Sequence, residues 1–170
     1  MYSFSGPDGA APLAGLVQSP GGNLYGTTTR GGALDGGTIF RITPGGSLST
    51  LYDFDGASGT DGWAPVAGLI QAADENENFY GMTSAGAVAG VSGTIFTVTP
   101  AGRLTTLHRF NMTNGGSLSR PQIIAQSSRS LPGRGDVRVG IADRHPRRRS
   151  LGLTWTATGN DHLHAGLKYN

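Results

Sequence analysis

The chain has 170 residues with 29 glycines, 9 prolines and no cysteine, which excludes disulfides, cysteine-ligated zinc and thiol catalysis. Glycine at this frequency disfavours long helices, because each one costs roughly 1 kcal/mol relative to alanine in a helix interior. The net charge of +2 combines two unlike parts: residues 1–119 hold four Arg and eight acidic residues, whereas residues 120–170 hold nine basic and three acidic residues.

The first part of the chain predicts short strands separated by turns. In chain order we expect strands at residues 14–18, 24–28, 38–43 and 48–54, each rich in the branched or aromatic residues that suit a pleated surface. A Pro-Gly-Gly turn at residues 20–22, a glycine-rich loop at 30–37 and a tight turn at 44–46 separate them. The pattern therefore predicts four antiparallel strands.

The same order of blocks then returns 53 to 56 residues later. Residues 8–18 (DGAAPLAGLVQ) return as 61–71 (DGWAPVAGLIQ), 23–28 (NLYGTT) as 78–83 (NFYGMT), 37–44 (GTIFRITP) as 93–100 (GTIFTVTP), and 48–54 (LSTLYDF) as 104–110 (LTTLHRF). The segment Tyr2-Ser3-Phe4 matches the end of the last block and is interpreted as the stump of an earlier copy.

Four antiparallel strands with a period near fifty residues are typical of a β-propeller blade. We therefore predict an all-β fold of tandem four-stranded blades, incomplete, with an irregular C-terminal tail. The predicted units are residues 1–51 with the stump of a preceding blade, 52–107, the start of a third at 108–126, and a basic tail at 127–170. Because so few blades leave sheet faces and edges uncovered, we expect marginal stability for the isolated chain.

At these blocks the chain resembles the GloVer tandem repeat proteins (the Gloeobacter/Verrucomicrobia repeat). The resemblance covers about residues 2–118 and depends on all of the blocks above in order. It implies an exported or cell-surface bacterial protein with many copies of the repeat, and no enzymatic activity. This chain departs from that pattern in its few copies, in a start at Met1 inside a repeat without an export signal, and in having no recognisable anchor.

After residue 118 the expected NLYG and GTIF blocks do not return, and the charge changes sign. The chain holds twelve Arg and one Lys, a bias typical of GC-rich DNA read in another frame. We interpret the tail as the product of a frameshift near residues 118–125, with a genuine disordered or weakly folded basic tail as the alternative. Translating the other two frames tests this, because a GNLYG-like block should appear in one of them.

Three patterns in the tail carry possible chemistry, and for each the plainer interpretation is favoured. The arginines at 147–149 could attract nucleic acid or anionic lipid, but without interleaved aromatic residues a solvated charge run is preferred. The Arg-Gly-Asp at 134–136 matches an adhesion tripeptide that also recurs by chance. His162 and His164 beside Asp161 could hold a metal ion, although the sequence places no third ligand with them.

Two features of the repeats remain open to a ligand. Asp53, Asp55 and Asp61 crowd one segment and could bind Ca²⁺, but Asp61-Gly62, like Asp8-Gly9, is more simply a turn. Trp63 replaces the small Ala10 of the first copy, and could stack on a sugar or peptide or fill the gap between blades.

No catalytic constellation is visible in the intact repeats. Residues 1–107 contain no histidine, and the glycines at 31–32 precede a strand and not a helix, which disfavours phosphate binding. We therefore predict no catalytic, cofactor-binding or metal site, and no enzyme. The predicted function is a structural or binding repeat module, a fragment of an exported protein.

The expected partners are neighbouring repeats of a longer chain or a self-associated copy, with no nucleic acid, no membrane-spanning segment and an unknown ligand. The alternative is a fragment of a propeller lectin or hydrolase whose active site lies on missing blades. Flanking DNA discriminates between the two, because an enzyme should carry inserted loops with His, Asp or Glu.

Overall fold

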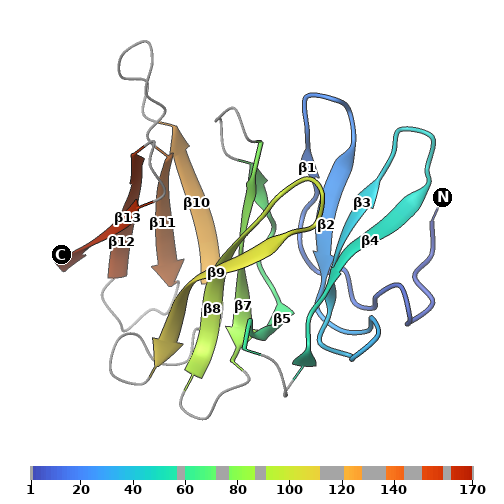
Figure 1. Cartoon of the computed structure of the whole chain (residues 1–170), viewed down its shortest axis with the longest axis horizontal. Coiled ribbons are helices and arrows are strands. Elements are labelled where there is room, and N and C mark those ends of the chain that lie inside the picture. Colours follow the sequence, from blue (N-terminus) through green and yellow to red (C-terminus); the bar gives the residue numbers. More distant parts are fainter. Residues whose placement is uncertain are drawn as a thin grey trace.

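The computed structural model describes the backbone in eight segments, and all of them are β-strands, turns or loops without an α-helix (Figure 1). The segments are residues 2–56, 60–71, 77–86, 91–111, 121–127, 137–143, 151–158 and 162–169, with side chains described at 2–56, 60–71, 77–86 and 93–110. Within these segments no helix has the length and apolar character needed to cross a membrane.

The first copy of the repeat forms one four-stranded antiparallel sheet. Its strands are β1 (Val17–Gln18), β2 (Leu24–Thr28), β3 (Thr38–Ile42) and β4 (Leu48–Asp53), paired in chain order. The prediction of four antiparallel strands in the first copy is confirmed, although β1 is shorter than expected.

The second copy forms a five-stranded sheet. Its strands are β5 (Trp63–Pro65), β6 (Ile70–Gln71), β7 (Phe79–Ala85), β8 (Val91–Val98) and β9 (Leu104–Asn111). Strands β7, β8 and β9 pair in order, and both β5 and β6 pair with β7. In the first copy the counterpart of β5 is a single bridge between Ala10 and Arg30, so the two sheets share one plan.

The two copies agree in their irregularities as well. The β3–β4 pairing shifts register between Ile39 and Phe40, and the β8–β9 pairing shifts at the equivalent Ile95 and Phe96. Ala11 and Ala64 share a left-handed backbone, with φ of 55° and 53°, which is uncommon for a residue that is not glycine. The sequence recurrence is therefore a recurrence of backbone structure.

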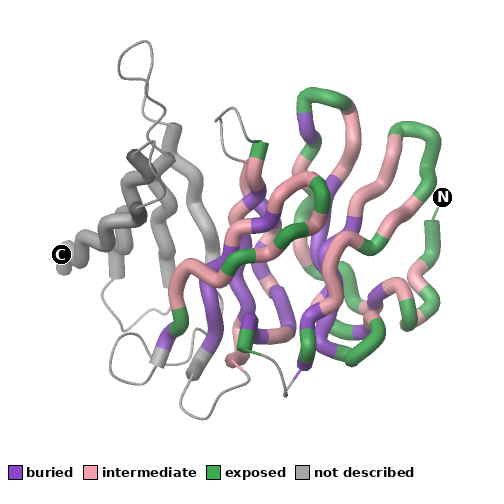
Figure 2. The backbone as a smooth tube through the Cα atoms, in the orientation of Figure 1, coloured by how far each residue is buried: buried purple, intermediate pink, exposed green. Residues whose placement is uncertain are grey.

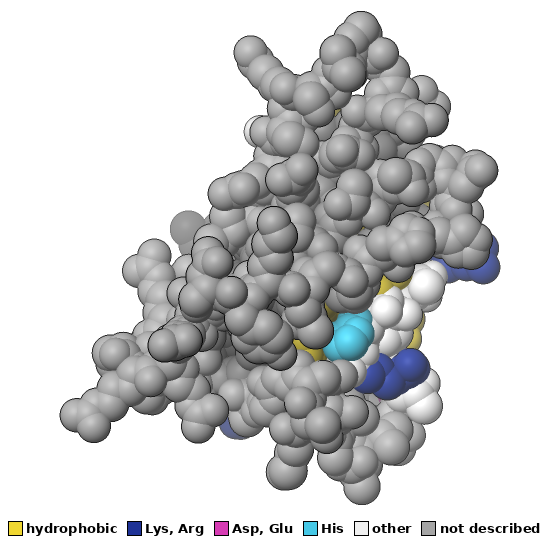
Figure 3. Space-filling view, turned by 90° about the vertical axis from the view of Figure 1, so that its left-hand side faces the viewer, with side chains coloured by type: hydrophobic (Ala, Val, Ile, Leu, Met, Phe, Trp, Pro, Cys, Tyr) yellow, Lys and Arg dark blue, Asp and Glu magenta, His cyan; other side chains and the backbone are white. Residues whose placement is uncertain are grey.

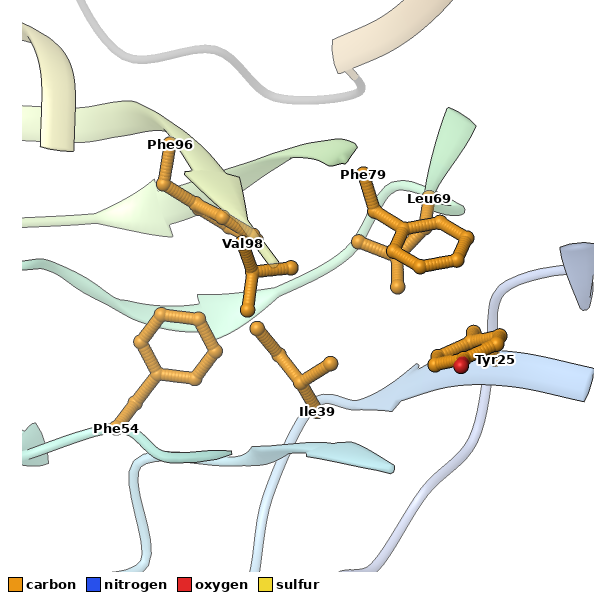
Figure 4. Close-up of a cluster of buried hydrophobic side chains, with 7 residues drawn as sticks. All are labelled: Tyr25, Ile39, Phe54, Leu69, Phe79, Phe96 and Val98. Carbon is orange, nitrogen blue, oxygen red and sulfur yellow. The ribbon is translucent and has the colours of Figure 1, made fainter. Parts of the chain in front are cut away.

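The two sheets stack face to face, and the core lies between them (Figures 1 and 2). Figure 4 shows its seven buried side chains: Tyr25, Ile39 and Phe54 from the first copy, and Leu69, Phe79, Phe96 and Val98 from the second. The ring centroids of Tyr25 and Phe79 are 4.2 Å apart, and those of Phe54 and Phe96 are 5.4 Å apart. Apolar burial between repeats thus holds the pair together.

Hydrogen bonds also join the sheets beside this core. The Ala64 N–H donates to the carbonyl of Gly36 at 2.8 Å, and the Thr29 hydroxyl donates to the carbonyl of Pro65 at 3.1 Å. Because Ala64 and Pro65 both belong to β5, the start of the second copy is bonded directly to the loops of the first.

The described residues of the C-terminal segment form strands, whereas the prediction was an irregular tail at residues 127–170. The segment contains β10 (Pro121–Ser127), β11 (Val137–Asp143), β12 (Leu151–Thr158) and β13 (His162–Tyr169), which form the antiparallel pairs β10–β11 and β12–β13. The physical reason is the alternation of apolar residues along these segments, as in VRVGI at 137–141 and LGLTW at 151–155, which favours strands even where the repeat motifs are missing.

Candidate functional site

Each copy has a pair of buried threonines near the end of its central strands. The hydroxyl oxygens of Thr28 and Thr38 are 2.9 Å apart, and those of Thr83 and Thr94 are also 2.9 Å apart. The Thr83 hydroxyl oxygen accepts the backbone N–H of Thr94 at 2.9 Å. These polar groups satisfy one another inside the sheet, so they hold structure and are not free for a ligand.

The Asp8-Gly9 segment lies in a turn, as predicted, in which the Gly9 N–H donates to the Gly6 carbonyl at 3.0 Å, whereas Asp61 lies in a bend. Gly9 and Gly62 have φ of 123° and 84°, a backbone region that favours glycine. The Asp8 carboxylate accepts the backbone N–H of Ser5 at 2.8 Å and also accepts the Tyr2 hydroxyl. In the second copy the Tyr52 hydroxyl donates to Asp61 at 2.5 Å, so the Tyr–Asp bond recurs with the repeat.

Burial distinguishes the two Tyr–Asp pairs. Asp61 is 7% exposed, and its Oδ1 is buried without a hydrogen-bond partner among the described atoms. Burial raises the pKa of Tyr52, and its hydrogen bond to Asp61 and the charges of Asp61 and Asp55 raise that pKa further. At the half-buried Asp8 the bond from Tyr2 lowers the pKa of the carboxyl.

The three acids considered for calcium do not gather around one point. Asp53 accepts the backbone N–H of Ala33 at 3.0 Å, whereas Asp61 faces Tyr52. Where side chains are described, no three His, Cys, Asp or Glu residues are grouped to hold a metal ion.

The glycine-rich loop of the first copy uses its own N–H groups. Gly31 donates to Asp35 Oδ1 at 2.8 Å, Gly32 donates to the Gly6 carbonyl at 2.9 Å, and Ala33 donates to Asp53. These three N–H groups therefore bond within the protein, and a phosphate bound at this loop would have to displace their partners.

Trp63 lies half-buried on β5 and packs against the core between the sheets. Of the two roles that the sequence left open, this position matches the filling of a gap between repeats. The small Ala10 stands at the same place in the first copy, where no such core is described.

The candidates in the tail are placed only in part. Residues 134–136, residues 147–149 and Asp161 lie outside the described residues. His162 and His164 fall in β13, opposite Thr158 and Thr156 of β12.

An aromatic pair marks the end of every copy. Edge-to-face contacts join Tyr2 to Phe4, Tyr52 to Phe54 and His108 to Phe110, at centroid distances of 5.5, 5.2 and 4.9 Å. His108 takes the place of tyrosine, and burial lowers its pKa. It is the histidine whose side chain is coloured in Figure 3.

The sequence prediction did not identify the outward face of the first sheet as a candidate surface. Leu16 is 51% exposed there, and Leu24 and Ile42 are half-buried. Phe40 on the same face is buried and contacts Phe4 at a centroid distance of 5.1 Å. The sequence feature that points to this face is the segment Tyr2-Ser3-Phe4. Phe4 corresponds in the repeat to Phe54, and Phe54 packs on the next sheet.

Two sheets built on one plan and stacked through a shared core define the class: an all-β tandem-repeat protein whose candidate site is the face between repeats. The chain belongs to the Gloeobacter/Verrucomicrobia repeat family, whose family model matches residues 1–131. No curated protein matches the chain.

Proposed function

We propose that this chain is a non-enzymatic structural or binding module, a fragment of an exported or cell-surface bacterial repeat protein. The observation that carries the proposal is the shared core, in which buried apolar side chains of the two copies form one cluster. A unit whose apolar residues serve contact with its neighbour acts by stacking in an array.

The chemistry of the polar groups supports this role. The turn acids, the loop N–H groups and the threonine hydroxyls described above are engaged in bonds within the protein. Such groups orient the backbone of the repeat, and they present no nucleophile and base aimed at a common point.

We further propose that the sheets are blades of β-propeller type. Support comes from the antiparallel order of β1 to β4 in chain order, from the matching order of β7 to β9, and from face-to-face stacking. Closure of such a ring requires further repeats, since propellers have typically four to eight blades.

Treating intact cells of the native host with an external protease tests the proposed location. We expect loss of the full-length protein, detected with an antibody raised against this chain, while a cytosolic marker stays intact. Protection of the protein to the same degree as the marker would refute an exported module.

A further inference from the structure

We propose that the outward face of the first sheet is the docking site of one more repeat of this family, the repeat that ends in Tyr2 and Phe4. The open face is defined as Leu16, Leu24 and Ile42, which lie beside the buried Phe40. The inference rests on the proposed function, since it names the partner of the module and the surface that the partner covers.

The first argument is the exposure of the side chains at the same repeat positions in the second sheet. Leu16 and Leu24 match Leu69 and Phe79, and Ile42 matches Val98. Leu69 is 5% exposed, Val98 1% and Phe79 0%, against 51% for Leu16. One face of the repeat is therefore covered in one copy and open in the other.

The stacked pair also shows what covers such a face. Tyr25 lies on Phe79, and Ile39 packs in the same cluster as Leu69 and Val98 (Figure 4). An added repeat would place its tyrosine over Leu24 and its isoleucine near Leu16 and Ile42.

The third covering residue is already in place. Phe4 contacts Phe40 at 5.1 Å and an interplanar angle of 64°, and Phe54 contacts Phe96 at 5.4 Å and 60°. Phe54 directly follows β4 of the covering sheet, so Phe4 holds the position that the last strand of a covering sheet would reach. This contact sets both the orientation of the occupant and its place ahead of Tyr2 in the chain.

Two glycine positions of the repeat are crowded in the second copy and open in the first. A Cβ added at Gly68 would meet the carbonyl oxygen of Gly15 at 3.3 Å, and one at Gly102 would meet that of Leu51 at 2.4 Å. At the matching Gly15 and Gly46, an added Cβ would meet nothing within 4 Å. The space beside the first sheet thus corresponds to the space that the first sheet occupies beside the second.

A chain extended by one repeat tests the proposal. A copy of residues 2–51 is fused ahead of Tyr2, so that Leu51 of the added copy precedes Tyr2 as Leu51 precedes Tyr52 in the native chain. Because the chain has no cysteine, Leu16→Cys makes a unique thiol probe in both the native and the extended chain.

We expect thiol labelling of Leu16→Cys to slow by at least about tenfold in the extended chain, because a covered side chain reacts only through local opening. Leu34→Cys, at a position 56% exposed in the glycine-rich loop, serves as the control and should react equally in both chains. Tyr25→Lys in the added copy alone should restore fast labelling of Leu16→Cys.

Fast labelling of Leu16→Cys in an extended chain whose added strands show slow amide exchange would overturn the proposal. Protection in the native chain that rises with protein concentration would identify a second copy as the occupant, and would also overturn it. Both readouts use purified protein, so they are independent of the protease test of cellular location.

Discussion

At the scale of single residues, buried threonine hydroxyls form hydrogen bonds between paired strands. Thr83 and Thr94 are fully buried, and the Thr94 hydroxyl donates to the Asp61 carbonyl at 2.7 Å. The Thr94 N–H donates to the Thr83 hydroxyl oxygen at 2.9 Å, so the β7–β8 pair depends on a side chain that nothing in the sequence singles out.

Replacing Thr83 with valine should lower the free energy of unfolding by about 1–3 kcal/mol, because the buried N–H of Thr94 loses its acceptor. Urea titration measures the change. Thr105→Val, at an exposed position of β9, is the control and should stay within about 0.5 kcal/mol of the native chain. Equal small effects would show that the Thr94 N–H finds another partner.

Tyr52→Phe should cost about 1–3 kcal/mol, because Asp61 is buried and its other oxygen already has no partner. The matched control is Tyr2→Phe, which removes the same bond between the exposed Tyr2 and the half-buried Asp8 and should change stability less. Urea midpoints of the two variants decide the point. Similar losses in both would mean that burial does not set the strength of this bond.

His108 should make the chain sensitive to mild acid. Burial lowers its pKa in the folded state below the usual 6.5, so below pH 6.5 the unfolded chain takes up a proton first. Stability should fall as the pH decreases from 7 to 5, and His108→Tyr, the residue of the other copies, should reduce that fall. Urea midpoints at the two pH values measure this. A fall of the same size in the variant would assign it to other groups.

At the scale of elements, the glycine of the NLYG and NFYG blocks is explained by the strand opposite. Gly81 lies opposite Phe96 across β7 and β8, and Gly26 lies opposite Phe40 across β2 and β3. A Cβ added at Gly81 would meet the Phe96 ring at 2.2 Å and Leu69 at 2.9 Å. The ring of one strand therefore requires the glycine of its neighbour.

Gly81→Ala should destabilise the protein by about 1–3 kcal/mol, because the added methyl group must displace a fully buried ring. Gly45→Ala is the control, since its Cβ would meet only the Thr43 hydroxyl at 3.8 Å. Thermal unfolding of the two variants separates local crowding from a general effect of replacing glycine. A stable Gly81→Ala variant would show that the Phe96 ring can move.

At the scale of the whole molecule, two leucines at the same position of the repeat should behave differently. Leu69→Ala removes a side chain from the core between the sheets and should cost about 2–5 kcal/mol. Leu16→Ala alters the open face and should cost less than about 1 kcal/mol. Denaturant unfolding compares them directly, and equal costs would contradict the stacking described here.

The strands, their order and the Asp8-Gly9 turn were predictable from the sequence, because they depend on residues close together in the chain. Block recurrence predicted β2 to β4 and β7 to β9, and glycine after Asp8 and Asp61 predicted a positive φ. The strands of the C-terminal segment were not predicted, because the repeat motifs are absent there and only the apolar alternation indicates strands.

Burial could not be predicted in the same way. Leu16 and Leu69 stand in nearly identical sequences, as do Asp8 and Asp61, yet Leu69 and Asp61 are buried, whereas Leu16 is exposed and Asp8 is half-buried. The local sequence determined by itself that a four-stranded unit recurs. Only the tertiary structure decided which face of each unit is covered, because coverage depends on contact with a sheet some fifty residues away in the chain.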